Sequence, residues 1–374
     1  MTSFSPPVRV LMGPGPSNVP VRTLQAMAQP TIGHLDPAFQ QLMEMLKAQL
    51  RSAFRTSNDL TFAVSAPGSA GMEMCFANLV EPGDTVLVCR NGVFGGRMAD
   101  NAERAGGRVI CIDDDWGQPV DPEKLEQALR NHPETAIVAF VHAETSTGAL
   151  SDVRLLCDIA RRHGCLTIVD TVTSLGGSPL LVDEWDVDAT YSGSQKCLSC
   201  PPGLSPVSFN ERALEKIGKR ATKANSWFLD LKLVTHYWNG GGSRTYHHTA
   251  PVNALYALYD SLLILEEEGL ENAWARHASV HDRFRQGLEE LGINLLVPAH
   301  ARLPQLNSIV IPEGVDDTQV RRMLLDDYQL EIGAGLGVLA GNIWRVGLMG
   351  HNATAERVDF CLDALGTVLK RVRR

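Results

Sequence analysis

The chain has 374 residues, which is long enough for two domains with large buried cores. It is 44% hydrophobic and 21% charged, as expected for an ordinary globular protein, and its apolar runs are all far shorter than the roughly 20 residues that span a bilayer. The formal net charge of −9 argues against a nucleic-acid or anionic-membrane partner. Because we recognise no targeting signal, a cytoplasmic protein is expected.

The first twenty residues include the stretch "GPGPSNVP" at 13–20. Glycine and proline in such density block helix formation, so we predict an extended N-terminal arm over residues 1–20.

Short apolar runs then alternate with amphipathic stretches such as "AGMEMCFANLV" and "VRLLCDIARRHG". Most of the runs are apolar throughout, which is typical of strands covered by helices on both faces of a sheet. The alternation predicts an α/β fold with a doubly wound, mainly parallel sheet. The predicted strands are 60–64, 84–89, 108–112, 136–141, 165–170, 189–193 and 204–209.

The pattern changes near residue 265. The stretch 270–292 carries one apolar stripe and predicts a long helix. Shorter strand-like segments and two further helices follow it. We therefore predict a large domain over 21–265 and a smaller α+β domain over 266–374.

Three stretches follow predicted strands, where ligands bind in such sheets. In "APGSAGME", Gly68 and Ser69 open a helix whose N-terminus can attract phosphate, although a plain N-cap is the simpler interpretation. Asp170 ends an apolar strand and is either the counter-ion of a protonated ring nitrogen, a helix N-cap or an arginine partner. Lys196 follows the next strand, and a solvated surface lysine is its simplest interpretation.

Together, a phosphate cup, a carboxylate and a lysine at adjacent strand ends are the parts that hold pyridoxal 5′-phosphate. In this interpretation Asp170 keeps the pyridine nitrogen protonated. Lys196 forms a Schiff base with the aldehyde and then moves a proton as general base and acid.

Five ordered motifs make a resemblance specific: "HAETSTG" (142–148), "IVDTVTSLGG" (168–177), "YSGSQKCLSCPPGLSPVSFNERA" (191–213), "YHHTAPV" (246–252) and "IWRVGLMG" (343–350). The chain resembles class V aminotransferases nearly end to end. It is most similar to their alanine–glyoxylate and serine–glyoxylate (serine–pyruvate) branch. The resemblance implies a fold-type-I pyridoxal-phosphate transferase with a seven-stranded sheet, and a homodimer with shared active sites.

The resemblance also implies roles for individual residues, all as expectations. Lys196 and Asp170 are the catalytic pair. The residues expected to bind the cofactor, besides these two, are Gly68, Ser69, Phe94, Thr145, Val172, Gln195, and Tyr246 and Thr249 from the neighbouring subunit. Phe94 stands where the family stacks a larger aromatic side chain, often Trp or Tyr, on the ring. The residues expected to contact the substrate are Arg345, which clamps its α-carboxylate, Gly15 in the arm, and His34 near the mouth of the site.

The Cys-x-x-Cys of Cys197 and Cys200 is the main competing feature. With no second pair it lacks half of a zinc site, and adjacent histidines such as His247 and His248 rarely bind the same metal. We expect no metal, and the two thiols are interpreted as small fillers beside Lys196. Most of the eight cysteines lie in apolar segments, which indicates reduced, buried thiols.

Two other polar features have simple interpretations. The acidic run 113–115 is expected to be a solvated turn rather than a metal cage. His34 and His351 are expected to be satisfied structural histidines.

The resemblance thus implies an enzyme that moves an amino group from alanine or serine to glyoxylate or pyruvate by ping-pong kinetics. It does not rank these donors and acceptors. An (S)-ureidoglycine–glyoxylate aminotransferase, a pyridoxal-phosphate lyase such as a cysteine desulfurase, and a cofactor-free Cys-x-x-Cys protein stay as alternatives.

Overall fold

Seven strands form one central sheet in the computed structural model, which describes residues 4–238 and 244–372. They are β2 (Leu60–Val64), β3 (Thr85–Arg90), β4 (Arg108–Asp113), β5 (Thr135–Val141), β8 (Leu166–Asp170), β9 (Ala189–Tyr191) and β10 (Ser205–Phe209). Their spatial order is β2-β10-β9-β8-β5-β3-β4, and only β10 runs antiparallel to its neighbours. The predicted mainly parallel seven-stranded sheet is confirmed, and each strand overlaps a predicted run.

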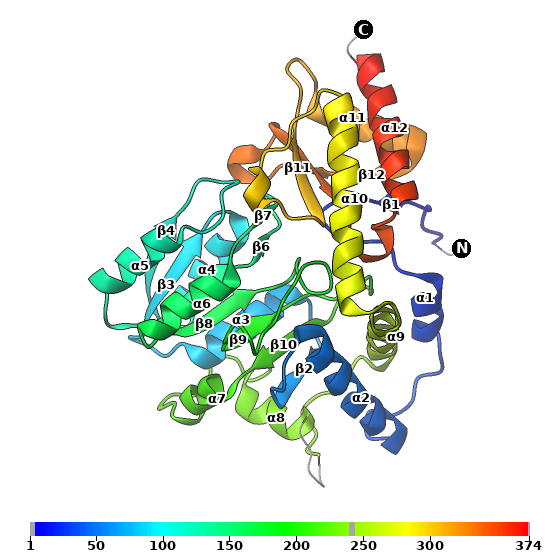
Figure 1. Ribbon diagram of the computed structural model, residues 1–374. Helices are drawn as coiled ribbons and strands as arrows, with labels where there is room; N and C mark the ends of the chain where they lie inside the picture. Colours follow the sequence, from blue (N-terminus) through cyan, green and yellow to red (C-terminus); the bar gives the residue numbers. More distant parts are fainter. Residues whose placement is uncertain (1–3, 239–243, 373–374) are drawn as a thin grey trace.

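Helices cover both faces of this sheet (Figure 1). Strand β8 is buried along its whole length, and α3 and α6 both pack against it. The helices within residues 21–268 are α1 (Val21–Met27), α2 (Pro37–Phe54), α3 (Gly68–Leu79), α4 (Val93–Arg104), α5 (Pro122–Asn131), α6 (Val153–Arg162), α7 (Glu211–Gly218), α8 (Leu231–Trp238) and α9 (Val252–Glu268).

Strand β4 departs from the prediction of strands covered on both faces. It lies at the edge of the sheet and pairs only with β3. Arg108, Cys111 and Asp113 are exposed on it. Cys111 is therefore exposed, whereas the other seven cysteines are buried, because an edge strand cannot be covered as fully as a central one.

The C-terminal part builds a second apolar core around a three-stranded sheet of order β11-β14-β13. Its long helix α10 (Leu270–Glu290) buries Leu270, His277, His281, Phe284 and Leu288, which confirms one buried stripe. The division at residue 265 stays a prediction. The remaining elements are α11 (Asp317–Tyr328), α12 (Ala355–Val372), β1 (Val10–Leu11), β6 (Ala143–Glu144), β7 (Ala149–Leu150), β11 (Leu306–Val310), β12 (Leu330–Glu331), β13 (Gly333–Ala334), β14 (Ile343–Gly347) and the 3₁₀ turns Ala299–Ala301, Gly337–Leu339 and Gly350–Asn352.

The described part of the N-terminal arm is extended, as predicted, and it is docked on the rest of the chain. Strand β1 pairs in parallel with β12, and Met12 is fully buried in the second core. Further along, the backbone N–H of Ser17 donates to the carbonyl of Gln195 at 3.0 Å. The arm therefore joins the C-terminal core to the loop that follows β9.

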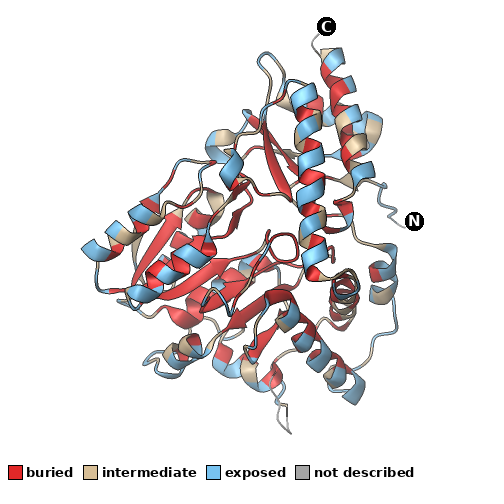
Figure 2. Ribbon diagram, viewed as in Figure 1, coloured by how far each residue is buried: buried red, intermediate tan, exposed pale blue. Residues whose placement is uncertain are grey.

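Burial follows this layered arrangement. Figure 2 shows the strands of the central sheet buried and the outer faces of the helices exposed. Within the described ranges, no helix has both the length and the apolar character needed to cross a membrane.

Candidate active site

The residues predicted for the site lie where parallel strands end at one edge of the central sheet. Asp170 is the last residue of β8, and Lys196 lies in the loop after β9. Arg345 comes from β14, and its Nη1 donates to the carbonyl of Thr145 at 3.1 Å, in the turn that follows β5 and β6. The structure thus brings side chains from the central sheet and from the three-stranded sheet to one edge, where ligands bind in sheets of this kind.

Asp170 is a buried carboxylate that forms no ion pair within the described part of the chain. It is 2% exposed, and it accepts hydrogen bonds from the Val172 N–H at 2.8 Å and the Tyr191 hydroxyl at 2.7 Å. Burial raises the pKa of Asp170 to about 7, and the two hydrogen bonds oppose that rise. The helix N-cap alternative is wrong, because turns follow β8, and the arginine alternative is wrong, because the partners of the carboxylate among the described residues are Val172 and Tyr191. A cationic ligand group would stabilise its charge.

Lys196 is a buried amine beneath the N-terminal arm, not a solvated surface lysine. It is 8% exposed, and its Nζ donates to the carbonyl of Pro14. The arm lies so close that a Cβ at Gly15 would be 2.5 Å from Nζ. Burial, and then the charge of Arg345, lower the pKa of Lys196 to about 8. A larger fraction of this amine is therefore neutral and nucleophilic near pH 7 than in a surface lysine.

Arg345 is a buried guanidinium surrounded by backbone carbonyls. Its Nε donates to the carbonyl of Ala334 at 2.8 Å, and its side chain forms no ion pair with any residue that the structure describes. Burial lowers the pKa of Arg345 to about 10, and the charge of Glu144 opposes this effect. Arg345 therefore forms no ion pair at the strand edge within the described part of the chain. The planar fork of N–H groups can bind the carboxylate of a ligand.

The turn from β2 into α3 packs against the segment that follows Asp170. Helix α3 begins at Gly68 and no side chain caps it, so the interpretation of Ser69 as an N-cap is wrong. Gly68 is buried, and a Cβ on it would be 3.4 Å from Cγ2 of Val172, whereas Ser69 is exposed. The Oε1 atom of Gln195 is buried without a hydrogen-bond partner. The uncapped helix N-terminus can hold an anion.

A third wall of the site is the turn around Thr145. Thr145 is buried, and its hydroxyl hydrogen-bonds to that of Thr173. Phe94 is half-buried on the first turn of α4, with the guanidinium carbon of Arg97 4.8 Å from its ring centroid. The Phe94 N–H donates to Glu144 at 3.2 Å. Glu144 was not predicted from the sequence, although it is the one acidic residue in the motif "HAETSTG" after β5.

Three predicted contact residues form no hydrogen bond or ring contact with this buried group within the described chain. Tyr246 is 62% exposed, and its hydroxyl lies 3.3 Å from Oγ1 of the exposed Thr249. The imidazole of His34 contacts the ring of Tyr246, with 5.3 Å between the centroids. These hydrogen-bond and ring contacts link the three residues to one another and not to Lys196.

Cys197 and Cys200 are buried thiols in the Lys196 loop. Burial raises the pKa of the Cys197 thiol to about 12 and the pKa of Cys200 further, so both are poor nucleophiles at neutral pH. His247 and His248 bond to each other through their Nδ1 atoms at 2.8 Å. Across residues 4–238 and 244–372, no three His, Cys, Asp or Glu side chains are grouped to hold a metal ion.

Two simple interpretations of polar residues need correction. Asp113 and Asp115 are exposed, but Asp114 is only 8% exposed. Its side chain turns inward toward α5 and forms an ion pair with Lys124 at 2.7 Å. The acidic run is therefore not wholly a solvated turn. His351 is exposed, and among the described residues its imidazole has no hydrogen-bond partner, whereas its backbone N–H donates to Ser199, so it is not a satisfied structural histidine.

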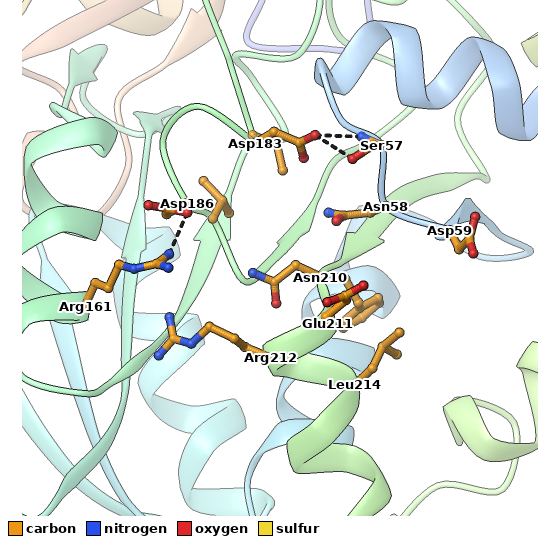
Figure 3. A pocket seen from close by; sticks show the side chains of 13 residues that line it. Ser57, Asn58, Asp59, Arg161, Asp183, Asp186, Asn210, Glu211, Arg212 and Leu214 are labelled. Carbon is orange, nitrogen blue, oxygen red and sulfur yellow. Dashed lines mark hydrogen bonds and ion pairs between the residues drawn. The ribbon is translucent and has the colours of Figure 1, made fainter.

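A cavity of about 510 Å³ lies at the opposite edge of the sheet, and Figure 3 shows it. Residues before β2 and β9 and after β10 line it, and none of the predicted site residues does. Three of its charged groups already have partners, since Arg161 pairs with Asp186 at 2.5 Å and Asp183 accepts two hydrogen bonds from Ser57, both 2.8 Å long. We therefore do not take it as the functional site.

This fold, with an amine, a carboxylate and a guanidinium gathered at the strand ends, defines a known class. Residues 10–360 match the family model described as Aminotransferase class-V. The chain belongs to the class V aminotransferase family, and the resemblance found in the sequence is confirmed.

Three relatives show how far the similarity extends. The chain is 40% identical to the alanine–glyoxylate aminotransferase of Drosophila melanogaster, over 97% of this chain and 93% of that protein. The solved alanine–glyoxylate aminotransferase from Nostoc sp. superposes with a TM-score of 0.96 at 47% identity, covering 99% of this chain and 97% of that one. The ureidoglycine–glyoxylate aminotransferase from Bacillus subtilis superposes with a TM-score of 0.97 at 36% identity, covering 100% and 96%.

Proposed function

We propose that the protein is a pyridoxal 5′-phosphate-dependent transaminase that moves the amino group of alanine or serine to glyoxylate or pyruvate. The observation that carries this proposal is the meeting of Lys196, Asp170 and Arg345 at one edge of the sheet. All three are less than a tenth exposed, and none has an ion-pair partner among the described residues. Charges buried without partners are costly, which supports a ligand that pairs with all of them.

The residues present fit the proposed cofactor. The uncapped start of α3 at Gly68 and Ser69 suits a phosphate dianion, and the side-chain amide of Gln195 has an N–H₂ group that can donate to such an anion. Asp170 suits a protonated ring nitrogen, and Lys196 suits an aldehyde. When bound, the cofactor supplies an electron-accepting ring and a carbon that stores the transferred amino group.

The chain's own side chains then have distinct tasks. Arg345 holds the α-carboxylate of the amino donor or the keto acid. The Nζ of Lys196, with its pKa lowered to about 8, takes a proton from the substrate Cα and later returns it. Asp170 stays ionised once a ring cation pairs with it, because an opposite charge at that distance lowers its pKa.

The N-terminal arm limits the size of the substrate. Pro14 and Gly15 lie directly on the amine of Lys196 and keep water from it. A donor with a short side chain, such as alanine or serine, needs the smallest displacement of this cover. Gly15 and His34 were both expected to contact the substrate. Gly15 lies against Lys196, which supports its contact, whereas the ring of His34 contacts Tyr246.

A homodimer belongs to the proposal. Helix α1 exposes Val21, Leu24 and Met27, which are 70%, 48% and 37% exposed. An exposed apolar strip of this kind supports a contact with a second subunit. Tyr246 and Thr249 are exposed in the single chain and would then bind the cofactor phosphate of the partner. A cytoplasmic location stays a prediction from the sequence.

The main alternative is the transfer of an amino group from (S)-ureidoglycine to glyoxylate. It is favoured by the 36% identity to the Bacillus subtilis enzyme over 98% of the chain. A cysteine desulfurase is less well supported. That reaction needs a mobile nucleophilic thiol, and Cys111, the one exposed cysteine in the described ranges, lies inside strand β4.

A spectroscopic donor and acceptor screen tests the proposal. The purified protein should be yellow, and alanine or serine should bleach the visible band that glyoxylate or pyruvate restores. The variant Lys196→Ala should lose turnover and keep its fold by circular dichroism, whereas Lys232→Ala, at an exposed position on α8, should behave as wild type. Bleaching by ureidoglycine alone would select the alternative, and normal turnover of Lys196→Ala would contradict the mechanism.

A further inference from the structure

Glu144 is a fully buried carboxylate that has no role in the reaction described above. It is 0% exposed and forms no ion pair within the described residues. Burial raises its pKa, while four hydrogen bonds to the carboxylate oppose that rise. Two come from the N–H and hydroxyl of Ser146, at 3.0 and 2.6 Å, and two from the N–H groups of Phe94 and Gly95, at 3.2 and 3.4 Å.

These contacts make Glu144 the cap of helix α4. The helix's own N-cap residue, Gly92, has no side chain that could cap it. The first N–H, from Val93, instead donates to the Ser146 hydroxyl at 2.9 Å, and the next two donate to Glu144. The close approach requires a glycine, because a Cβ at position 92 would lie 2.5 Å from Cγ of Glu144. A carboxylate at a helix N-terminus also interacts favourably with the helix dipole.

The same short turn also fixes the substrate side of the site. The residue after Glu144 is Thr145, and its carbonyl accepts the Nη1 of Arg345 at 3.1 Å. The charge of Glu144 raises the pKa values of both Arg345 and Asp170, which indicates that the carboxylate lies near these two groups. Glu144 therefore stands between the helix that carries Phe94 and the guanidinium that faces the substrate.

We propose that Glu144 is a positioning residue of the active site, which holds Phe94 against the cofactor ring by capping α4 from the neighbouring turn. The inference rests on the proposed function, because it assumes that pyridoxal phosphate lies against Phe94. It predicts that cofactor affinity depends on a carboxylate that does not itself touch the cofactor.

The test compares Glu144→Gln with Glu103→Gln in the holoenzyme and in cofactor-free protein. Glutamine keeps the size of the side chain but removes its charge and turns an N–H₂ group toward one set of donors. Glu103 is on the same helix, is exposed and makes no side-chain hydrogen bond among those described, so it is a matched control. The readouts are the dissociation constant for pyridoxal phosphate and the visible circular dichroism of the bound chromophore, with far-ultraviolet dichroism to verify the fold.

We expect Glu144→Gln to weaken cofactor binding about tenfold and to reduce the visible dichroism, because losing one cap and its charge is an effect of this size. Glu103→Gln should match wild type. Wild-type affinity and dichroism in Glu144→Gln would overturn the inference. If Glu144→Gln does not fold, the variant Ser146→Ala tests the same cap. Unchanged affinity of Ser146→Ala for pyridoxal phosphate would also overturn the inference. Failure of the wild-type protein to bind pyridoxal phosphate would instead remove the proposed function.

Discussion

The contact between the N-terminal arm and Lys196 gives the sharpest prediction, for the substitution Gly15→Ala. Gly15 has φ +99°, a backbone conformation that alanine adopts at a cost of about 1–3 kcal/mol. The added Cβ would also lie 2.5 Å from Nζ and 2.6 Å from Cδ of Lys196. Either the arm leaves the site or the reacting amine moves. We therefore expect kcat/KM for alanine with glyoxylate to fall about tenfold to hundredfold, as a barrier increase of about 1–3 kcal/mol implies.

The pH dependence separates the two ways in which the site can relax. If the arm leaves, Lys196 regains water and its pKa rises from about 8 toward the reference value of ~10.4. In cofactor-free protein, the rate at which this amine reacts with an aldehyde probe should then require a higher pH than in wild type. The matched control is Gly33→Ala, where a Cβ meets nothing within 4 Å. Equal activity and equal pH profiles for the two variants would refute the assignment of Gly15.

Three further predictions concern charge and assembly. Arg345→Lys should raise KM for alanine and glyoxylate at least tenfold in steady-state kinetics, because an ammonium cannot form two parallel bonds to a carboxylate; an unchanged KM would contradict the clamp. Burial raises the pKa of Asp170 from a reference of ~3.9 to about 7, so the stability that its protonated form contributes below about pH 4 is lost as pH rises through 7. Denaturant unfolding of cofactor-free Asp170→Asn should therefore depend less on pH between about 4 and 8 than wild type, and an equal dependence would argue against the raised pKa. Leu24→Asp should shift the protein toward monomers in sedimentation velocity, and an unchanged dimer would exclude α1 from the interface.

Local patterns were enough to predict the sheet and the positions of Asp170 and Lys196 at the ends of two of its strands. Strands such as β5 and β8 are buried on both faces, so their sequences are continuous apolar runs with clear ends. A charged residue directly after such a run, as with Asp170, stands out for the same reason. Strand β4 was wrongly predicted to be covered on both faces, because its apolar run does not reveal that it lies at the edge of the sheet.

The parts that sequence reasoning missed are contacts between distant segments. Nothing in "HAETSTG" shows that Glu144 caps a helix that begins about fifty residues earlier. Likewise, the glycines and prolines of the arm predict an extended chain but not its place on Lys196, 182 residues away. Such pairings are fixed by how distant segments pack in three dimensions, and a single sequence carries no local signal for that.

The position of the site between two cores explains how the chain tolerates so many buried charges. The large core and the C-terminal core are separate clusters of apolar side chains, and Lys196, Asp170 and Arg345 belong to neither. Burial of apolar side chains in the two cores can therefore stabilise the fold and offset the cost of desolvating these three charged groups. A ligand that pairs with these charges offsets that cost only in the folded protein, so binding and stability are linked. The unpaired charges therefore lower the stability of the ligand-free protein, and in return the site is already ordered before its ligand binds.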